Sequence, residues 1–210
     1  MTYTMKKYIL IALYALTLAS CANKVVIREH AFIKPMSTEL SEYVENAEVP
    51  ATFSTSDFNW MGGNLTMTVY SEDIYDAVEL HKMAKGDTLL FNGDTIIVEK
   101  IEGNGDLTVN GGIEEGGAYL VPNEGGTYRA LLMNDHSAYT KLGKVQLPLS
   151  DNFTLIDCGD NPTDTYDTIC TEQKLYLEHV KEYKRDFNEL NTRVLIENGI
   201  INKITRHWIP

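Results

Sequence analysis

Four aspartates lie close together in one short stretch of the chain: Asp157, Asp160, Asp164 and Asp167. Calcium takes several oxygen ligands that converge at about 2.4 Å, and the carboxylates of an acidic loop can supply them. The spacing does not match the EF-hand pattern, however, and Asp also favours turns for local backbone reasons. The stretch is therefore either a calcium site or an ordinary polar turn, and the sequence favours the turn.

Two cysteines, Cys158 and Cys170, bracket the same acidic stretch. In an exported protein an even pair favours a disulfide, which for a loop of this size contributes roughly 3 kcal/mol in the chain-entropy model. Two free thiols or a metal site are the alternatives. Without a Cys-x-x-Cys pair the spacing does not indicate zinc.

Three aromatic residues, Phe53, Phe58 and Trp60, lie just before the Gly62-Gly63 turn. Exposed rings beside a turn can stack on sugars or form a hot spot for a partner protein. The more common role of such rings is core packing or cross-strand pairing. Ligand stacking is therefore the less favoured of the two hypotheses.

No catalytic residue is predicted. None of the five histidines lies in a His-Glu-x-x-His or other zinc spacing. Asp135, His136 and Ser137 are adjacent, but a catalytic triad needs these groups to converge in space rather than in sequence. There is no Gly-x-Ser-x-Gly elbow, and the glycine pairs lead into strands rather than opening a phosphate-binding helix.

The N-terminal segment predicts export. Lys6 and Lys7 precede an uncharged run, Tyr8–Ala19, which is too short to cross a bilayer as a helix because that takes about 20 residues. The run ends Leu18-Ala19-Ser20-Cys21, which resembles the lipobox of bacterial lipoproteins: an aliphatic residue, two small residues and cysteine. The resemblance implies cleavage after Ser20 and a diacylglyceryl group on Cys21.

The alternatives for this segment are an ordinary signal peptide with a chance cysteine and a buried apolar first helix. Met5 is an alternative start to Met1. Ala22 follows the cysteine where an inner-membrane sorting signal would have Asp, which resembles sorting to the outer membrane in enterobacteria. We therefore expect a lipid-anchored protein of the cell envelope, on the periplasmic face of the outer membrane if the host is Gram-negative.

Composition indicates a folded, acidic protein. The 190 residues from Cys21 onward suffice for one domain or two small ones, and a hydrophobic content of 43% supports a packed core. Removal of Lys6 and Lys7 with the leader takes the formal charge from −12 to −14. Such a surface disfavours nucleic acid and favours solubility, cationic ligands or basic partners.

A period of two in hydrophobicity predicts many short strands. They cover residues 51–55, 65–70, 88–91, 94–101, 107–110, 118–121, 127–133, 144–149 and 153–156. Asn92-Gly93 and Asn198-Gly199 predict tight hairpins, because both central residues must take positive φ. We expect a short helix over 37–46, a strand and turn over 75–83, and a long helix over 176–190, where apolar residues recur at helical spacing.

The predicted fold class is α+β, mostly β: a small antiparallel barrel or sandwich with one long C-terminal helix and a terminal hairpin packed on it. The expected organisation is a signal peptide (1–20), a tether and short helix (21–48), the β domain (49–157), and the disulfide loop, helix and hairpin (158–210).

The sequence favours a non-enzymatic binding or interaction module, held to a membrane by the lipid on Cys21, with an envelope protein or a glycan as its partner. No nucleic acid is expected, and no cofactor other than the calcium considered above. The alternative is an envelope hydrolase whose acids and histidines meet only in three dimensions.

Overall fold

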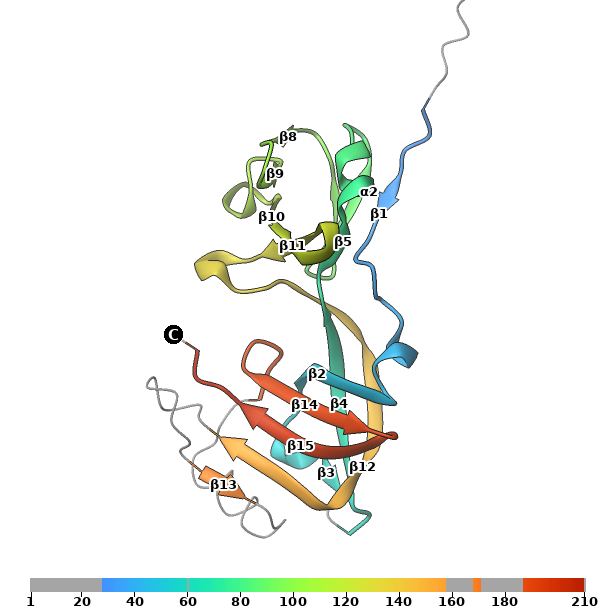
Figure 1. Cartoon of the computed structure of the whole chain (residues 1–210), viewed down its shortest axis with the longest axis vertical. Coiled ribbons are helices and arrows are strands. Elements are labelled where there is room, and N and C mark those ends of the chain that lie inside the picture. Colours follow the sequence, from blue (N-terminus) through green and yellow to red (C-terminus); the bar gives the residue numbers. More distant parts are fainter. Residues whose placement is uncertain (1–27, 60, 158–167, 171–186, 210) are drawn as a thin grey trace, which may run out of the picture. The chain divides into compact units, whose positions relative to one another are not determined.

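The computed structural model describes residues 28–59, 61–157, 168–170 and 187–209, with side chains for all of these except 157 and 168–170. The chain divides into two units, residues 1–30 and 31–210. Every element labelled in Figure 1 belongs to the second unit. Within the described ranges, no helix combines the length and the apolar character that a membrane crossing requires.

Five strands close into a barrel (Figure 1). They are β2 (Asn46–Thr52), β4 (Asn64–Glu72), β12 (Tyr139–Asp157), β14 (Thr192–Glu197) and β15 (Ile200–Arg206). The order around the barrel is β2, β4, β12, β15, β14 and back to β2, and every pair is antiparallel except β12 and β15. Numbered along the chain, this is the 1-2-3-5-4-1 connectivity of the OB-fold, a five-stranded Greek-key barrel.

Short elements flank the barrel strands. The strand β3 (Phe58–Asn59) pairs with β4, and β13 (Thr168–Cys170) pairs with β12. Two 3-10 helices, η1 (Leu40–Glu42) and η2 (Thr55–Asp57), lie before and after β2.

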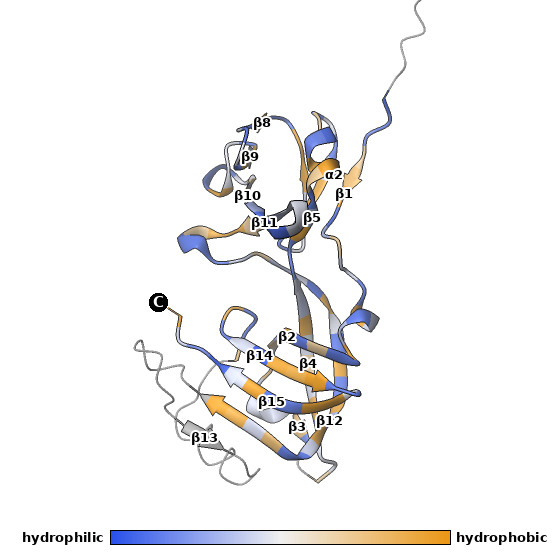
Figure 2. Ribbon diagram, in the orientation of Figure 1, coloured by the Kyte–Doolittle hydropathy of each residue, from blue (hydrophilic) through white to orange (hydrophobic). Residues whose placement is uncertain are grey.

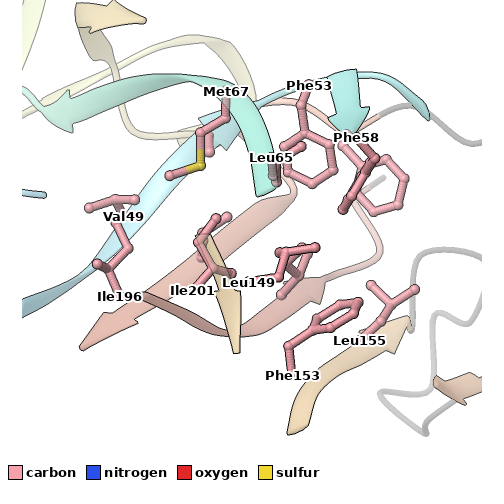
Figure 3. Close-up of a cluster of buried hydrophobic side chains, with 14 of the residues drawn as sticks. Val49, Phe53, Phe58, Leu65, Met67, Leu149, Phe153, Leu155, Ile196 and Ile201 are labelled. Carbon is pink, nitrogen blue, oxygen red and sulfur yellow. The ribbon is translucent and has the colours of Figure 1, made fainter. Parts of the chain in front are cut away.

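The barrel core follows from alternation along the strands. In β4, Leu65, Met67 and Val69 are fully buried, whereas Thr66 and Thr68 between them are half-buried on the other face. Figure 3 shows side chains from all five barrel strands meeting in one cluster. Its fully or nearly fully buried members are Val49, Ala51, Phe53, Phe58, Leu65, Met67, Val69, Leu149, Phe153, Leu155, Phe187, Val194, Ile196, Ile201 and Ile204.

Between β4 and β12, residues 73–138 form a second β body, called the insertion below. Its elements are β5 (Ile74–Asp76), α2 (Ala77–Lys82), β6 (Thr88–Phe91), β7 (Asp94–Ile97), β8 (Ile101–Glu102), β9 (Leu107–Val109), η3 (Ile113–Glu115), β10 (Ala118–Asn123), η4 (Glu124–Gly126), β11 (Thr127–Leu131) and η5 (Met133–Asp135). One sheet has the order β5-β11-β10-β9-β8. The other has the order β1-β6-β7, in which β1 (Phe32–Ile33) precedes the barrel in sequence and pairs parallel to β6.

The insertion has a core of its own. It contains Ile33, Tyr75, Leu80, Met83, Leu89, Phe91, Val98, Leu107, Val109, Ala118, Leu120, Tyr128, Ala130 and Ala138. The two sheets thus bury their inner faces against each other, separately from the barrel core.

Both Asn-Gly hairpins are present. Asn92 and Gly93 (φ 51° and 80°) join β6 to β7, and Asn198 and Gly199 (φ 54° and 74°) join β14 to β15. Each pair takes the left-handed conformation that a two-residue hairpin of this kind requires, and Asn and Gly tolerate it best. This local signal was sufficient to predict the connections from sequence.

The predicted long C-terminal helix is wrong. The longest α-helix of the described residues, α2, has six residues, and most of the structure is strand. Phe187 forms a bridge with Phe53, and their rings stack with centroids 4.8 Å apart, so tertiary contacts override the helical spacing at this position. Leu190 lies in a turn, and the predicted helix positions 176–186 fall outside the described residues.

Three further expectations of the fold class are corrected. The barrel is not wholly antiparallel, because β12 and β15 run parallel. The terminal hairpin does not pack on the barrel but supplies two of its five strands, since β14 pairs with β2 and β15 with β12. Only three residues of the helix expected over 37–46 form a helical turn, η1.

Residues 77–82 are helical where a strand and turn were predicted. The side chain of Asp76 accepts a hydrogen bond from the Glu79 N–H at 2.9 Å and thereby caps the first turn of α2. An Asp at this position satisfies one of the unpaired donors at a helix start. Asp76 and Glu79 form an Asp-x-x-Glu capping pattern that is present in the sequence. The turn residues Lys85-Gly86-Asp87 that follow shortly after favour a strand and turn instead.

We expect Phe187→Ala to lower the free energy of unfolding by about 3–5 kcal/mol, because it empties a site in the barrel core that is 2% exposed. Met61→Ala, at a fully exposed position, is the control and should change it by less than about 0.5 kcal/mol. Urea unfolding followed by circular dichroism measures both. Equal effects of the two substitutions would show that Phe187 does not belong to the core.

Candidate ligand-binding pocket

A pocket of about 460 Å³ is lined by barrel strands, by the first strand of the insertion and by its β10–β11 hairpin. The barrel contributes Glu48, Pro50, Glu72, Tyr139 and Arg193. Its size falls within the usual range for small-molecule sites, roughly 300–1,000 Å³.

Further walls come from the insertion and from the segment before β2. The insertion supplies Ile74, Asn123 and Thr127. The preceding segment supplies Met36, Ser37 and Tyr43. The lining is therefore mixed, with apolar and aromatic surface beside hydroxyl, amide and charged groups.

Strand register brings the barrel residues of this pocket together. Tyr139 is the direct partner of Glu72 in the β12–β4 pair, and Arg193 is the partner of Pro50 in the β14–β2 pair. Directly opposed residues share a face of the sheet. Since Val194 and Val49, their chain neighbours, point into the barrel core, alternation turns Arg193 and Pro50 to the outer face.

Arg193 is held by uncharged groups. Its Nη1 donates to the carbonyl oxygens of Glu189 (2.8 Å) and Thr192 (3.0 Å), and its Nη2 donates to the hydroxyl of Tyr139 at 2.6 Å. The guanidinium carbon lies 5.4 Å from the centroid of the Tyr139 ring, within cation–π range. These contacts fix the guanidinium at the pocket wall.

The charge of Arg193 has no carboxylate partner within 4 Å among the residues that the structure describes. A guanidinium has five N–H donors, and the described contacts use three. Two donors on a positive, oriented group thus remain for a ligand. Such a group binds carboxylate or phosphate oxygens with good geometry.

Two carboxylates also line the pocket, and each has a partner. Glu72 Oε1 accepts a hydrogen bond from the hydroxyl of Ser137 at 2.5 Å. Glu48 Oε1 lies 3.7 Å from Nζ of Lys203, in a half-exposed ion pair. Their remaining oxygens can accept hydrogen bonds from ligand hydroxyl, amide or ammonium groups.

Asp73 lies between two residues that line the pocket and holds this part of the chain in place through hydrogen bonds. Glu72 and Ile74 line the pocket, and Asp73 between them is fully buried on the opposite face. Its N–H donates to the carbonyl of Ala138 (3.0 Å), its carbonyl accepts from Ala130 N–H (2.9 Å), and Oδ2 accepts from Asn92 N–H at 2.6 Å.

The surroundings of Asp73 are buried and polar. Burial raises the pKa of the Asp73 carboxyl, while the hydrogen bond from the N–H of Asn92 lowers it. Burial and the charge of Asp73 also raise the pKa of Tyr75, whose hydroxyl donates to the Leu90 carbonyl at 2.5 Å. Within the described chain, Oδ1 of Asp73 and the side-chain hydroxyls of Ser71 and Thr140 have no hydrogen-bond partner.

The structure places Phe53 and Phe58 in the barrel core, 5% and 7% exposed, with their rings edge-to-face at 5.6 Å. Rings buried to this extent offer no face to a ligand. The third member of the predicted stacking group, Trp60, lies outside the described residues.

The predicted acidic loop, disulfide and lipid attachment also lie outside the described side chains. These are Cys21, Asp157, Cys158, Asp160, Asp164, Asp167 and Cys170. Calcium binding and the disulfide therefore stay predictions. Within the part of the chain that the structure describes, no three His, Cys, Asp or Glu side chains are grouped in a way that could hold a metal ion.

Among the described contacts, no side-chain hydrogen bond joins Asp135, His136 and Ser137. Asn134 and Asp135 take positive φ (59° and 60°) in the η5 turn, and Ser137 points its hydroxyl at Glu72. The turn thus supports the pocket carboxylate instead of assembling a nucleophile.

Sequence reasoning did not identify the pocket residues. Glu48, Glu72, Tyr139 and Arg193 lie on four strands far apart in the chain, and no local motif links them. The only indication of a binding site in the sequence is weak: Arg193 lies in a strand of the hairpin that Asn198-Gly199 predicts.

No protein-family model, curated protein or solved structure matched the chain.

We expect Asp73→Asn to remove part of the pH dependence of stability. Because the pKa of Asp73 in the folded chain exceeds its ordinary value of 3.8, wild type loses stability as pH rises from about 4 through the folded-state pKa. Asn keeps an acceptor for the Asn92 N–H and carries no charge. Urea unfolding from pH 4 to 8 should show the stability of the variant, relative to wild type, rising with pH.

Asp73→Leu is the comparison. It removes the acceptor for Asn92 N–H and should therefore be about 1–3 kcal/mol less stable than Asp73→Asn at every pH. Parallel stability curves for wild type and Asp73→Asn would contradict the raised pKa.

Proposed function

We propose that this chain is a cell-envelope lipoprotein that binds a small carboxylate-bearing ligand in the pocket at Arg193, without chemical conversion. The lipobox-like Leu18-Ala19-Ser20-Cys21 supports export and anchoring. The observation that carries ligand binding is the guanidinium of Arg193, which is fixed by three hydrogen bonds and has no carboxylate of its own among the described residues.

The other walls narrow the class of ligand. Glu48 and Glu72 would repel a second or third negative charge and accept hydrogen bonds from hydroxyl or amide groups. Tyr43, Pro50 and Ile74 supply apolar surface. A sugar or short peptide with one carboxylate fits this lining better than a polyphosphate does, and peptidoglycan fragments in the envelope have that chemistry.

A second candidate, an envelope hydrolase, is favoured by one observation: Glu48 and Glu72 line the same pocket. Hydrolysis of glycosides uses a pair of carboxyl groups with separate acid and base roles. Here each carboxylate already has a structural partner, Lys203 or Ser137, which favours binding over catalysis.

We expect a muramyl dipeptide, offered to the full-length chain in detergent, to raise its melting temperature, and Arg193→Met to abolish the shift. A ligand at 100 times its dissociation constant stabilises the folded chain by about 2.7 kcal/mol. N,N′-diacetylchitobiose, a neutral sugar, tests whether the carboxylate is required. Lys85→Met, which removes an exposed cation that does not line the pocket, is the control and should bind as wild type does.

An unchanged shift in Arg193→Met would rule out the proposed site. N-acetylglucosaminyl-muramyl dipeptide carries the same carboxylate and adds a glycosidic bond. Mass spectrometry of its mixture with the protein separates the two candidates, because this ligand is recovered intact if the protein only binds it. Cleavage that is lost in Glu72→Gln would establish the hydrolase instead.

The anchor has its own test. We expect the chain to incorporate radiolabelled palmitate and remain with membranes after carbonate extraction, because two or three acyl chains hold durably where one is marginal. Cys21→Ser should lose both the label and the membrane retention. A labelled Cys21→Ser chain would place the lipid elsewhere.

A further inference from the structure

The three-stranded sheet β1-β6-β7 has one open face with large apolar side chains. Phe32 of β1 is 58% exposed and Ile97 of β7 is 62% exposed. Register places both beside Thr88 of β6, which pairs with Phe32 on one side and Ile97 on the other. Directly paired residues share a face, so the three form a row across the sheet.

The opposite face of this sheet is covered. Ile33 and Leu89, the next residues along β1 and β6, are buried in the core of the insertion, and Ile96 packs against it. Figure 2 shows β1 as an apolar segment of the chain. The exposed phenylalanine and isoleucine thus lie opposite a face that is already packed, and they are available for contact with an external partner.

The position of Phe32 in the chain identifies that partner. If the lipid is on Cys21, ten residues lie between the anchor and Phe32, and the eleven steps along the chain span only about 40 Å even when fully extended. The sheet then stays within this distance of the bilayer. Tethering makes the contact effectively intramolecular, so a few apolar side chains suffice to bias the orientation of the body.

Charges near the face do not suggest an electrostatic partner. Lys85 and Lys100 are paired with Glu99 and Glu102, each at 2.7 Å, and Lys34 donates to Thr38 at 3.3 Å. No uncompensated basic cluster is formed by these residues. The face therefore suits the apolar part of a bilayer interface and not a cluster of anionic headgroups.

We propose that the outer face of the β1-β6-β7 sheet, centred on Phe32 and Ile97, lies against the bilayer that holds the anchor. This rests on the proposed lipidation of Cys21. The anchor sets the distance to the membrane, and the apolar row sets which side of the folded body faces it.

The test uses the full-length chain in membranes, with the photocrosslinker benzoylphenylalanine placed at position 32, 97 or 133. Met133 is the matched control, because it is an apolar residue of the insertion that is equally exposed at 59%. After reconstitution into vesicles of neutral phosphatidylcholine, we expect phospholipid adducts at positions 32 and 97 at least threefold more often than at 133. Added anionic lipid should leave this ratio unchanged.

Equal adduct yields at the three positions, or crosslinks from position 32 to another protein chain, would overturn the proposal. Intact mass of the same samples distinguishes failure of the membrane-facing sheet from failure of the lipid anchor. A mature chain with diacylglyceryl but no positional preference refutes the membrane-facing sheet alone. A chain without the lipid refutes the proposed anchor, and the inference with it.

Discussion

The pairing of β12 with two different partners is the constraint on which the rest of the structure depends. Tyr139–Pro148 pairs antiparallel with β4, and from Leu149 onward the same strand pairs parallel with β15. A strand that changes partner in this way closes the sheet on itself and removes its open edges. The register between Leu149 and Thr154 is irregular, as expected where a long strand bends around a barrel.

The same pairing explains how a large insertion is accommodated. The chain leaves the barrel at Glu72 and returns at Tyr139, and these two residues are direct partners in the β4–β12 pair. The ends of the insertion are therefore held side by side by the barrel ladder. Asp73 adds hydrogen bonds to the β6–β7 turn, to Ala130 and to Ala138, and so fixes the first residues of the insertion beside the pocket.

What could be predicted from sequence is the part that local chemistry determines. Asn92-Gly93 and Asn198-Gly199 specify their hairpins because few other residues accept positive φ, and alternation located most strands. Closure of the barrel could not be predicted in this way. The strands β2 and β14 are separated by most of the sequence, and no local pattern indicates that they pair. Equally, nothing in the alternation of residues 65–133 marks the point at which the chain leaves one core and enters another.

The candidate site could not be predicted from the sequence either, because its residues come together only through long-range strand pairing. No local pattern distinguishes Arg193, because sequence cannot show that Tyr139 and two backbone carbonyls would take the place of an ion-pair partner. In contrast, Phe53 and Phe58 drew attention as aromatics beside a turn. Phe187 stacks on Phe53, which in turn meets Phe58 edge-to-face, so the packing of this pair depends on a long-range contact.

The overall charge sets a limit on how the pocket can select a ligand. A chain with formal charge −12 repels anions at long range, but at physiological salt this field decays over about 8 Å. Within the pocket the oriented guanidinium of Arg193 acts at contact distance, where geometry outweighs the distant charges. Recognition of the proposed ligand would therefore depend on short-range fit and not on electrostatic steering. A polyanion would meet the general repulsion and the two pocket carboxylates, whereas one carboxylate on a hydroxyl-rich ligand meets Arg193 and leaves Glu48 and Glu72 to accept its hydrogen bonds.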